Sequence, residues 1–191
     1  MPCVLDASGE PLRFGCEAGP WAVKINQAEL VELMAARKSG QTPGSGTGAA
    51  SAGAGAATAG AGAASDLADI IAGGVTLAVV TRGREGLLAF DGKTLWRGLL
   101  PGRLEVIQPV GSGDAATSAL SLGLARLLET GALSTADWPS LGLPALAEPA
   151  RADLIRDMVA AGAANAVTEG IGNAPPEVFS AMRARVRVEQ R

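Results

Sequence analysis

A glycine-rich turn that opens a helix is the part of this sequence best suited to chemistry. It reads Gly111-Ser112-Gly113-Asp114 and runs into a helix expected over residues 114–130. Backbone N–H groups at such a helix start can hold an anion, and the helix dipole adds roughly half a positive charge there. Phosphoryl transfer needs donors of this kind, because negative charge spreads over the phosphoryl oxygens in the transition state. Asp114 could accept the proton of an attacking hydroxyl; the alternative is a plain loop with an aspartate near a helix start.

A second candidate site lies where an expected strand runs into an expected helix. Asn26 and Glu29 stand three residues apart at the start of a helix over residues 27–37, so they face the same side of it. An amide and a carboxylate so placed can hold the water shell of Mg²⁺, which prefers oxygen ligands. The same residues also fit a helix cap, with Asn26 as N-cap and Glu29 at the third helical position. The two interpretations do not exclude each other.

A third candidate is the loop Thr81-Arg82-Gly83-Arg84-Glu85-Gly86, which follows a run rich in β-branched residues over 75–81. Such a run is typical of a central strand in a parallel sheet. Loops beyond the carboxyl ends of parallel strands are where α/β sheets bind ligands. The alternative is an ordinary turn that needs its two glycines for backbone freedom.

Strands alternate with helices along the chain, which predicts an α/β fold with a mostly parallel sheet flanked by helices. The expected strands cover residues 2–6, 21–24, 75–81, 86–90 and 94–99, the last two as a hairpin. The expected helices cover residues 27–37, 114–130, 151–167 and 175–185. Residues 39–65 are almost wholly Gly, Ala, Ser and Thr, so we expect a flexible insertion within one domain spanning residues 1–191.

Composition argues against several classes of function. The net charge of −3 comes from interleaved charges without the clustered basic face of a nucleic-acid surface, and the basic residues 183–191 fit a solvated helix or tail. The absence of histidine excludes zinc sites built from Cys and His, and also Ser-His and Cys-His nucleophiles. Cys3 and Cys16 do not make a disulfide framework, so we expect a reducing compartment, the cytoplasm. Neither a signal peptide nor a membrane span is expected.

In their order, these motifs resemble the ribokinase-like carbohydrate kinase family, and within it the branch of phosphofructokinase and tagatose-phosphate kinase. The matching motifs are Asp6-Ala7-Ser8-Gly9-Glu10, Lys24-Ile25-Asn26-Gln27-Ala28-Glu29-Leu30, Val80-Thr81-Arg82-Gly83-Arg84-Glu85-Gly86, Gly111-Ser112-Gly113-Asp114 and Ala160-Ala161-Gly162-Ala163-Ala164-Asn165-Ala166. The resemblance covers essentially the whole chain outside residues 39–65. Five ordered matches are far more specific than any one of them.

The resemblance implies an enzyme that transfers a phosphoryl group from ATP, with Mg²⁺, to a sugar or sugar phosphate. The catalytic residues would be the base Asp114 and the anion-hole residues Gly111, Ser112 and Gly113. Magnesium would be ordered, through water, by Asn26 and Glu29. The nucleotide would be contacted by Lys24, Asn26, Thr81, Gly83, Gly86 and, near the purine, Asn165.

The sequence also departs from the family pattern. Ile25 stands where the family usually has proline, and the Gly/Ala-rich insertion lies where a helix normally starts. The chain resembles only the C-terminal part of a family member, without the N-terminal region that supplies much of the sugar site, a lid and several strands. We therefore expect an unpaired apolar sheet edge with a tendency to self-association, and weak or absent sugar kinase activity. Two alternatives stay open: a non-catalytic nucleotide-binding or interaction module, and a truncated reading frame without independent function.

Overall fold

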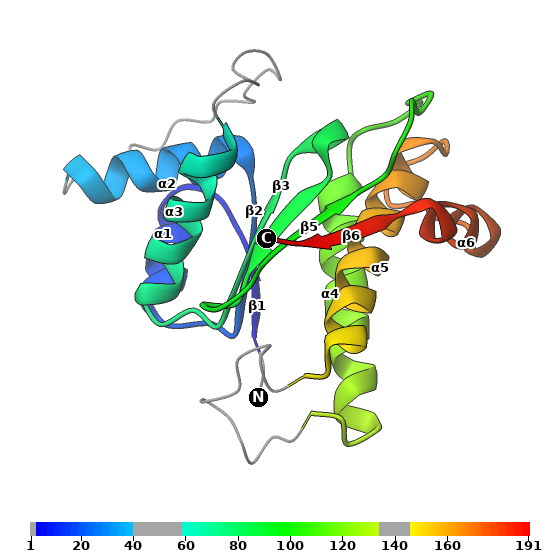
Figure 1. Ribbon diagram of the computed structural model, residues 1–191. Coiled ribbons are helices and arrows are strands. Elements are labelled where there is room, and N and C mark those ends of the chain that lie inside the picture. The colour runs from blue at the N-terminus through cyan, green and yellow to red at the C-terminus, as the bar shows by residue number, and fades with distance from the viewer. Residues whose placement is uncertain (1–2, 40–58, 134–145) are drawn as a thin grey trace.

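The computed structural model describes residues 3–39, 59–133 and 146–191 of the chain. They form a six-stranded sheet between two layers of helices (Figure 1). In their order across the sheet, the strands are β1 (Val4–Asp6), β2 (Ala22–Asn26), β3 (Leu77–Thr81), β4 (Leu87–Phe90), β5 (Leu95–Leu99) and β6 (Arg187–Gln190). The helices are α1 (Gly9–Glu17), α2 (Gln27–Ser39), α3 (Ala59–Ala72), the short 3-10 helix η1 (Gly83–Glu85), α4 (Ser112–Glu129), α5 (Glu148–Ala166) and α6 (Pro176–Arg185).

The sheet is mixed. Strands β1, β2 and β3 are parallel, whereas β4, β5 and β6 each pair antiparallel with the strand before them. The α/β fold predicted from the sequence is confirmed, but the expectation of a mostly parallel sheet holds only for its first three strands. For β4 and β5 the reason is local, because a hairpin can join only antiparallel strands, whereas the parallel strands are joined by crossovers that contain helices. Strand β6 follows α4, α5 and α6 in the chain and also pairs antiparallel with β5.

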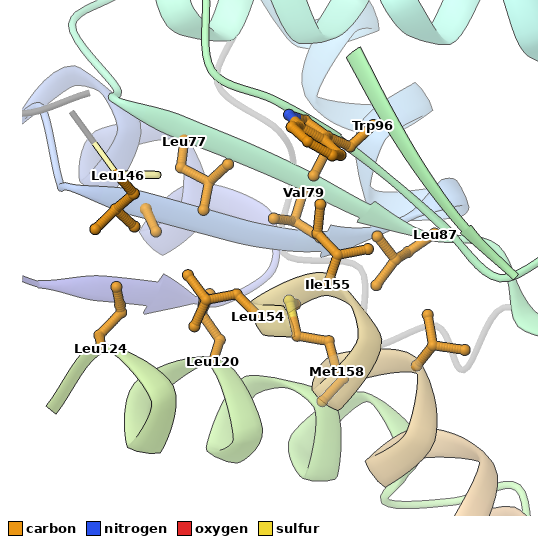
Figure 2. Close-up of a cluster of buried hydrophobic side chains, with 14 of the residues drawn as sticks. Leu77, Val79, Leu87, Trp96, Leu120, Leu124, Leu146, Leu154, Ile155 and Met158 are labelled. Atoms are coloured by element: carbon orange, nitrogen blue, oxygen red, sulfur yellow. The ribbon is translucent and has the colours of Figure 1, made fainter. Parts of the chain in front are cut away.

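Each face of the sheet buries its own apolar cluster. Helices α1, α2 and α3 cover one face and α4, α5 and α6 the other (Figure 1). Side chains of β3 alternate between the two, since Leu77 and Val79 pack toward α4 and α5 while Ala78 and Val80 pack toward α1 to α3. Figure 2 shows the first cluster, in which leucines of α4 meet Ile155 of α5 and the strands. Both layers are thereby fixed to the strands whose ends carry the candidate site.

Three elements differ from the sequence prediction. Helix α1 was not predicted, and strand β6 lies where a solvated helix or tail was expected. Helix α3 begins at Ala59, so residues 59–65 of the expected insertion are helical because Ala63 and Leu67 give that helix a buried side. The rest of the insertion, residues 40–58, lies outside the described residues.

No helix in the described ranges is both long and apolar enough to cross a membrane. Both cysteines are free thiols, Cys3 exposed and Cys16 buried. Burial raises the pKa of the Cys16 thiol above its ordinary value, which keeps it protonated and unreactive at neutral pH.

Truncation of Leu120 tests the packing of α4 on the sheet. Leu120 is 0% exposed in the cluster of Figure 2, so we expect Leu120→Ala to lower the free energy of unfolding by about 2–5 kcal/mol. Leu122→Ala on the same helix is the matched control, because Leu122 is 52% exposed and should cost less than about 0.5 kcal/mol. Urea unfolding measures both, and equal losses would contradict this packing.

Candidate functional site

The carboxyl ends of the three parallel strands meet at one edge of the sheet. Asp6 of β1 is the register partner of Lys24 of β2, and Asn26 of β2 is the partner of Thr81 of β3. Lys24 lies two residues from Ala22, which packs toward α4, so its side chain points to the same face. Residues from three candidate motifs, separated in the sequence, therefore lie beside the start of α4.

The turn before α4 requires glycine at position 111. Gly111 is the N-cap with a left-handed φ of +87°. A Cβ there would lie 2.9 Å from Ile171 Cγ2 and 3.0 Å from the Gly172 nitrogen, so no other residue fits without movement. Ser112 N–H donates to the Pro109 carbonyl and Ala115 N–H to the Gly111 carbonyl. Within the described residues, the intervening N–H groups of Gly113 and Asp114 have no acceptor, which leaves two donors for an anion.

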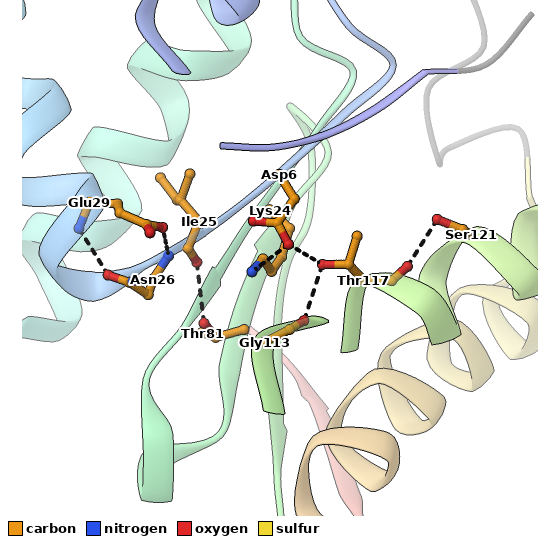
Figure 3. Close-up of polar contacts among 9 residues, drawn as sticks. All are labelled: Asp6, Lys24, Ile25, Asn26, Glu29, Thr81, Gly113, Thr117 and Ser121. Atoms are coloured by element: carbon orange, nitrogen blue, oxygen red, sulfur yellow. Dashed lines mark hydrogen bonds and ion pairs between the residues drawn. The ribbon is translucent and has the colours of Figure 1, made fainter. Parts of the chain in front are cut away.

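A buried ammonium group lies beside this turn. Lys24 is 5% exposed, and its Nζ donates to Asp6 Oδ2 at 2.8 Å (Figure 3). A Cβ placed on Gly113 would lie 3.1 Å from the same Nζ, so glycine gives the ammonium room against the turn. A cation and two free N–H groups thus converge at the start of α4.

Asp6 and Thr117 complete this network, although the sequence had assigned neither a role. Thr117 Oγ1 lies 2.6 Å from Asp6 Oδ2 and 3.1 Å from the Gly113 carbonyl, so its single proton can reach either acceptor (Figure 3). Asp6 was visible in the sequence as the last residue of an expected strand and the first of a family motif. Thr117 gave no signal apart from standing one helical turn after Gly113.

The side chain of Asn165, on α5, is hydrogen-bonded to the turn. This side chain is fully buried, and Nδ2 donates to the Val110 carbonyl at 2.9 Å and to Ser112 Oγ at 3.1 Å, with the Gln108 carbonyl at 3.3 Å. Its Oδ1 accepts the N–H of Gly172 at 2.7 Å. The amide that the resemblance places near a purine is thus fully used in joining the turn to α5 and to the loop that follows α5.

Asn26 and Glu29 form the helix cap that the sequence allowed as one interpretation. Asn26 Oδ1 accepts the N–H groups of Ala28 and Glu29, both at 2.9 Å, and Glu29 Oε2 accepts the Asn26 N–H at 2.7 Å. In the parts of the chain that the structure describes, no group of three or more acidic or cysteine side chains is arranged to hold a metal ion directly. The magnesium role of this pair stays a prediction.

The loop after β3 folds back as η1. Arg82 N–H donates to the Gly86 carbonyl at 2.8 Å, and the Arg82 guanidinium pairs with Glu85. Gly86 has a φ of +81°, and a Cβ there would stand 1.9 Å from the Gly98 carbonyl oxygen of β5. Gly83 is also left-handed at +54° but has open space around it. Packing therefore requires Gly86, whereas the space over Gly83 is free for a ligand.

The side chain of Asp114 takes part in none of these contacts. It lies in the first turn of α4, exposed, and the described residues give its carboxylate no hydrogen bond or ion pair. A carboxylate in that position is free to accept a proton from a molecule bound over the turn.

Comparison with known proteins identifies the fold. No protein-family model and no curated protein sequence matches the chain. Among solved structures, phosphofructokinase-2 from Escherichia coli in complex with substrates and products matches with a TM-score of 0.68 and 22% identity, over 96% of this chain and 47% of that one. Ribokinase from Thermotoga maritima matches with a TM-score of 0.53 and 14% identity, over 90% of this chain and 43% of that one.

The chain has the ribokinase-like fold. This confirms the fold that the resemblance of the five motifs implied. The chain spans about half the length of these solved structures, as expected for the C-terminal part of such a fold. At these identities the likeness shows the fold, and the chemistry has to be argued from this chain's own residues.

Asn165→Asp tests whether Asn165 sets the turn of this ribokinase-like fold. The change keeps the side-chain shape but removes the Nδ2 donor, so three acceptors would face a buried carboxyl group. We expect a loss of about 3 kcal/mol or more in the free energy of unfolding. The loss should grow as the pH rises above about 4, because burial among acceptors raises the pKa of the introduced carboxyl and disfavours its charged form.

The matched control is Asn173→Asp. Asn173 is exposed and makes one bond, from Nδ2 to the Glu169 carbonyl at 2.9 Å, so its replacement should cost less than about 1 kcal/mol. Urea unfolding of both variants in acidic and in neutral buffer gives the comparison. Similar losses at the two positions would show that Asn165 does not anchor the turn.

Proposed function

We propose that this chain carries the nucleotide-binding and phosphoryl-transfer part of an ATP-dependent kinase that acts on a sugar or sugar phosphate. One observation carries the proposal: within the described residues, two unpaired N–H groups at a helix start lie close to the buried ammonium of Lys24. Such a pair of donor types suits the negative charge of a transferring phosphoryl group. The ribokinase-like fold supports the assignment.

The proposed reaction assigns separate tasks to the turn and to Asp114. The acceptor hydroxyl gives its proton to the Asp114 carboxylate as its oxygen bonds to the γ-phosphorus of ATP. The bond from that phosphorus to the bridging oxygen breaks, and ADP leaves with the electron pair. The N–H groups of Gly113 and Asp114 and the Lys24 ammonium stabilise the charge on the transferring group.

The residues proposed for magnesium fit it only in part. Asn26 Oδ1 already accepts two N–H groups, so it is poorly placed to bind the ion directly. Glu29 uses Oε2 in the cap and keeps Oε1 for a water of the ion's shell. When bound, the ion would neutralise phosphate charge, and the water-mediated role expected from the sequence is the one we propose.

Exposed apolar side chains beside the turn support a place for a nucleobase. They come from the segment before the turn and the loop after α5, and they are Val106, Ile107, Val110 and Ile171. The two segments meet at Asn165, which bonds to the Val110 carbonyl and the Gly172 N–H. A flat aromatic base would cover apolar surface that water otherwise contacts. In this proposal Asn165 acts by holding both segments in place.

The acceptor is less well defined than the nucleotide. E. coli phosphofructokinase-2, one of the matching structures, is known in complex with fructose-6-phosphate, and for this chain we propose the same broad class of sugar or sugar phosphate. Because the chain spans about half of that enzyme, we expect transfer by the chain alone to be weak or absent. The same observation favours a second candidate, a nucleotide-binding or interaction module without catalysis.

We extend the proposal to assembly and location. Within the described residues, the outer edge of β1 has no partner strand, and Val4 and Leu5 on it are partly exposed, which favours self-association. A matching structure is the tetrameric inhibited form of E. coli phosphofructokinase-2.

Two free thiols fit a reducing compartment, and we propose the cytoplasm.

Calorimetric titration with ATP and Mg²⁺ tests nucleotide binding. We expect the purified chain to bind, and Lys24→Gln to weaken the affinity by about tenfold or more because a charge-assisted contact is lost. Asp114→Asn should leave the affinity within about twofold, since its carboxylate is assigned to the acceptor. Asp69→Asn, an exposed change on α3 across the sheet, is the control. A wild-type chain that does not bind ATP would contradict the kinase and the nucleotide-binding module, and would leave only an interaction module.

Transfer of labelled γ-phosphate to a panel of sugars and sugar phosphates separates the two candidates. If the chain is the transferring part of a kinase, slow transfer falls by about 100-fold or more in Asp114→Asn while ATP binding persists. A nucleotide-binding module shows binding without transfer, and Asp114→Asn changes nothing. Rapid turnover by the wild-type chain would refute the expectation that half of the fold is a poor catalyst.

A further inference from the structure

A pocket of ≈ 190 Å³ lies on the sheet face opposite the glycine turn. It is lined by Arg82, Glu85, Leu88, Leu95, Arg97 and Arg191. Its two leucines pack with the cluster under α1 to α3, whereas α4 and its turn cover the other face. The pocket is therefore separate from the proposed phosphoryl-transfer site.

The charges around this pocket are unevenly paired. Arg82 is held by Glu85 in its own loop. Arg97 and Arg191 reach the same oxygen of Glu189, Oε2, at 3.9 and 3.8 Å, which is too long for a strong hydrogen bond. Each guanidinium has five N–H donors, and among the described residues most of the donors of these two arginines have no acceptor. Of the three guanidinium groups that line the pocket, only that of Arg82 has a close side-chain carboxylate partner among the described residues.

The positions of these arginines are fixed by the sheet. Arg97 of β5 is the register partner of Leu88 of β4 and of Glu189 of β6, so it stands in the middle of the pocket face. Strand alternation points Thr81 toward α4 and Arg82 toward the pocket. Leu88 is buried and Leu95 partly buried, and apolar walls next to a charge strengthen its interaction with an anion.

We propose that this pocket binds a small, multiply charged oxyanion, either phosphorylated or polycarboxylic. Planar guanidinium groups recognise such ligands through paired N–H bonds to two oxygens. A single chloride could not use the donors of two guanidinium groups in this way. Binding here does not depend on the proposed kinase function, because none of the lining side chains belongs to the glycine turn or the Lys24 network.

Calorimetric titrations with pyrophosphate and with citrate, at low salt, test the proposal and separate the two ligand classes. We expect at least one probe to bind the purified chain and Arg97→Gln to weaken that binding by about tenfold or more. Arg126→Gln, an exposed change on α4, is the matched control and should leave the affinity within about twofold. Tighter binding of pyrophosphate would indicate a phosphorylated ligand, and tighter binding of citrate a polycarboxylic one.

Two further variants keep the test decisive. Arg191 is 57% exposed along its side chain, so Arg191→Gln should weaken binding without affecting the fold and replaces Arg97→Gln if that variant does not fold. Lys24→Gln identifies any pyrophosphate that binds at the glycine turn. The proposal is wrong if neither probe binds, if the arginine variants bind as the wild type does, or if only Lys24→Gln abolishes binding.

Discussion

The buried amide of Asn165 fixes the geometry on which the candidate site depends. Its Nδ2 donates to the last carbonyl before the turn and to Ser112 Oγ in the first turn of α4, while its Oδ1 takes the N–H of the loop beyond α5. Three segments are thereby held to one fully buried side chain. A left-handed turn at Gly111 can keep two N–H groups unpaired only if its neighbours are fixed in this way, since a free loop would relax to satisfy them.

The parallel half of the sheet supplies the second constraint. Because β1, β2 and β3 run in the same direction, their carboxyl ends bring Asp6, Lys24 and Thr81 to one edge. The chain then reverses twice, so the start of β4 and the carboxyl end of β5 also lie at that edge, where Leu87 pairs with Thr81 and Gly98 with Leu87. Strands β4 and β5 extend the sheet and build the arginine pocket on the opposite face. The Thr81–Gly86 loop is the only described element that contributes to both places.

Burial of Lys24 has a cost that its partner offsets. An ammonium group at 5% exposure needs a counter-charge, and Asp6 provides it at 2.8 Å while Thr117 helps to hold the carboxylate. Such a pair contributes little net stability, because removing the two charged groups from water costs about as much free energy as their attraction provides. What it does provide is a cation fixed in a dry position beside the turn, where its field on a bound phosphate is strongest.

The sequence by itself determined the features that local rules control. These features are Gly111 before a helix, the cap at Asn26 and Glu29, and the hairpin around Asp91-Gly92, each of which depends on neighbouring residues. Together with the order of the motifs, they predicted the fold class. The tertiary structure alone decided which distant groups meet: Asp6 with Lys24 and Thr117, Asn165 with the turn, and β6 with β5. These contacts join residues up to 111 positions apart, and only the packing of helices on the sheet sets such distances. Asn165 illustrates the difference, since its residue type and place in a small-residue helix were visible, but its partners were not.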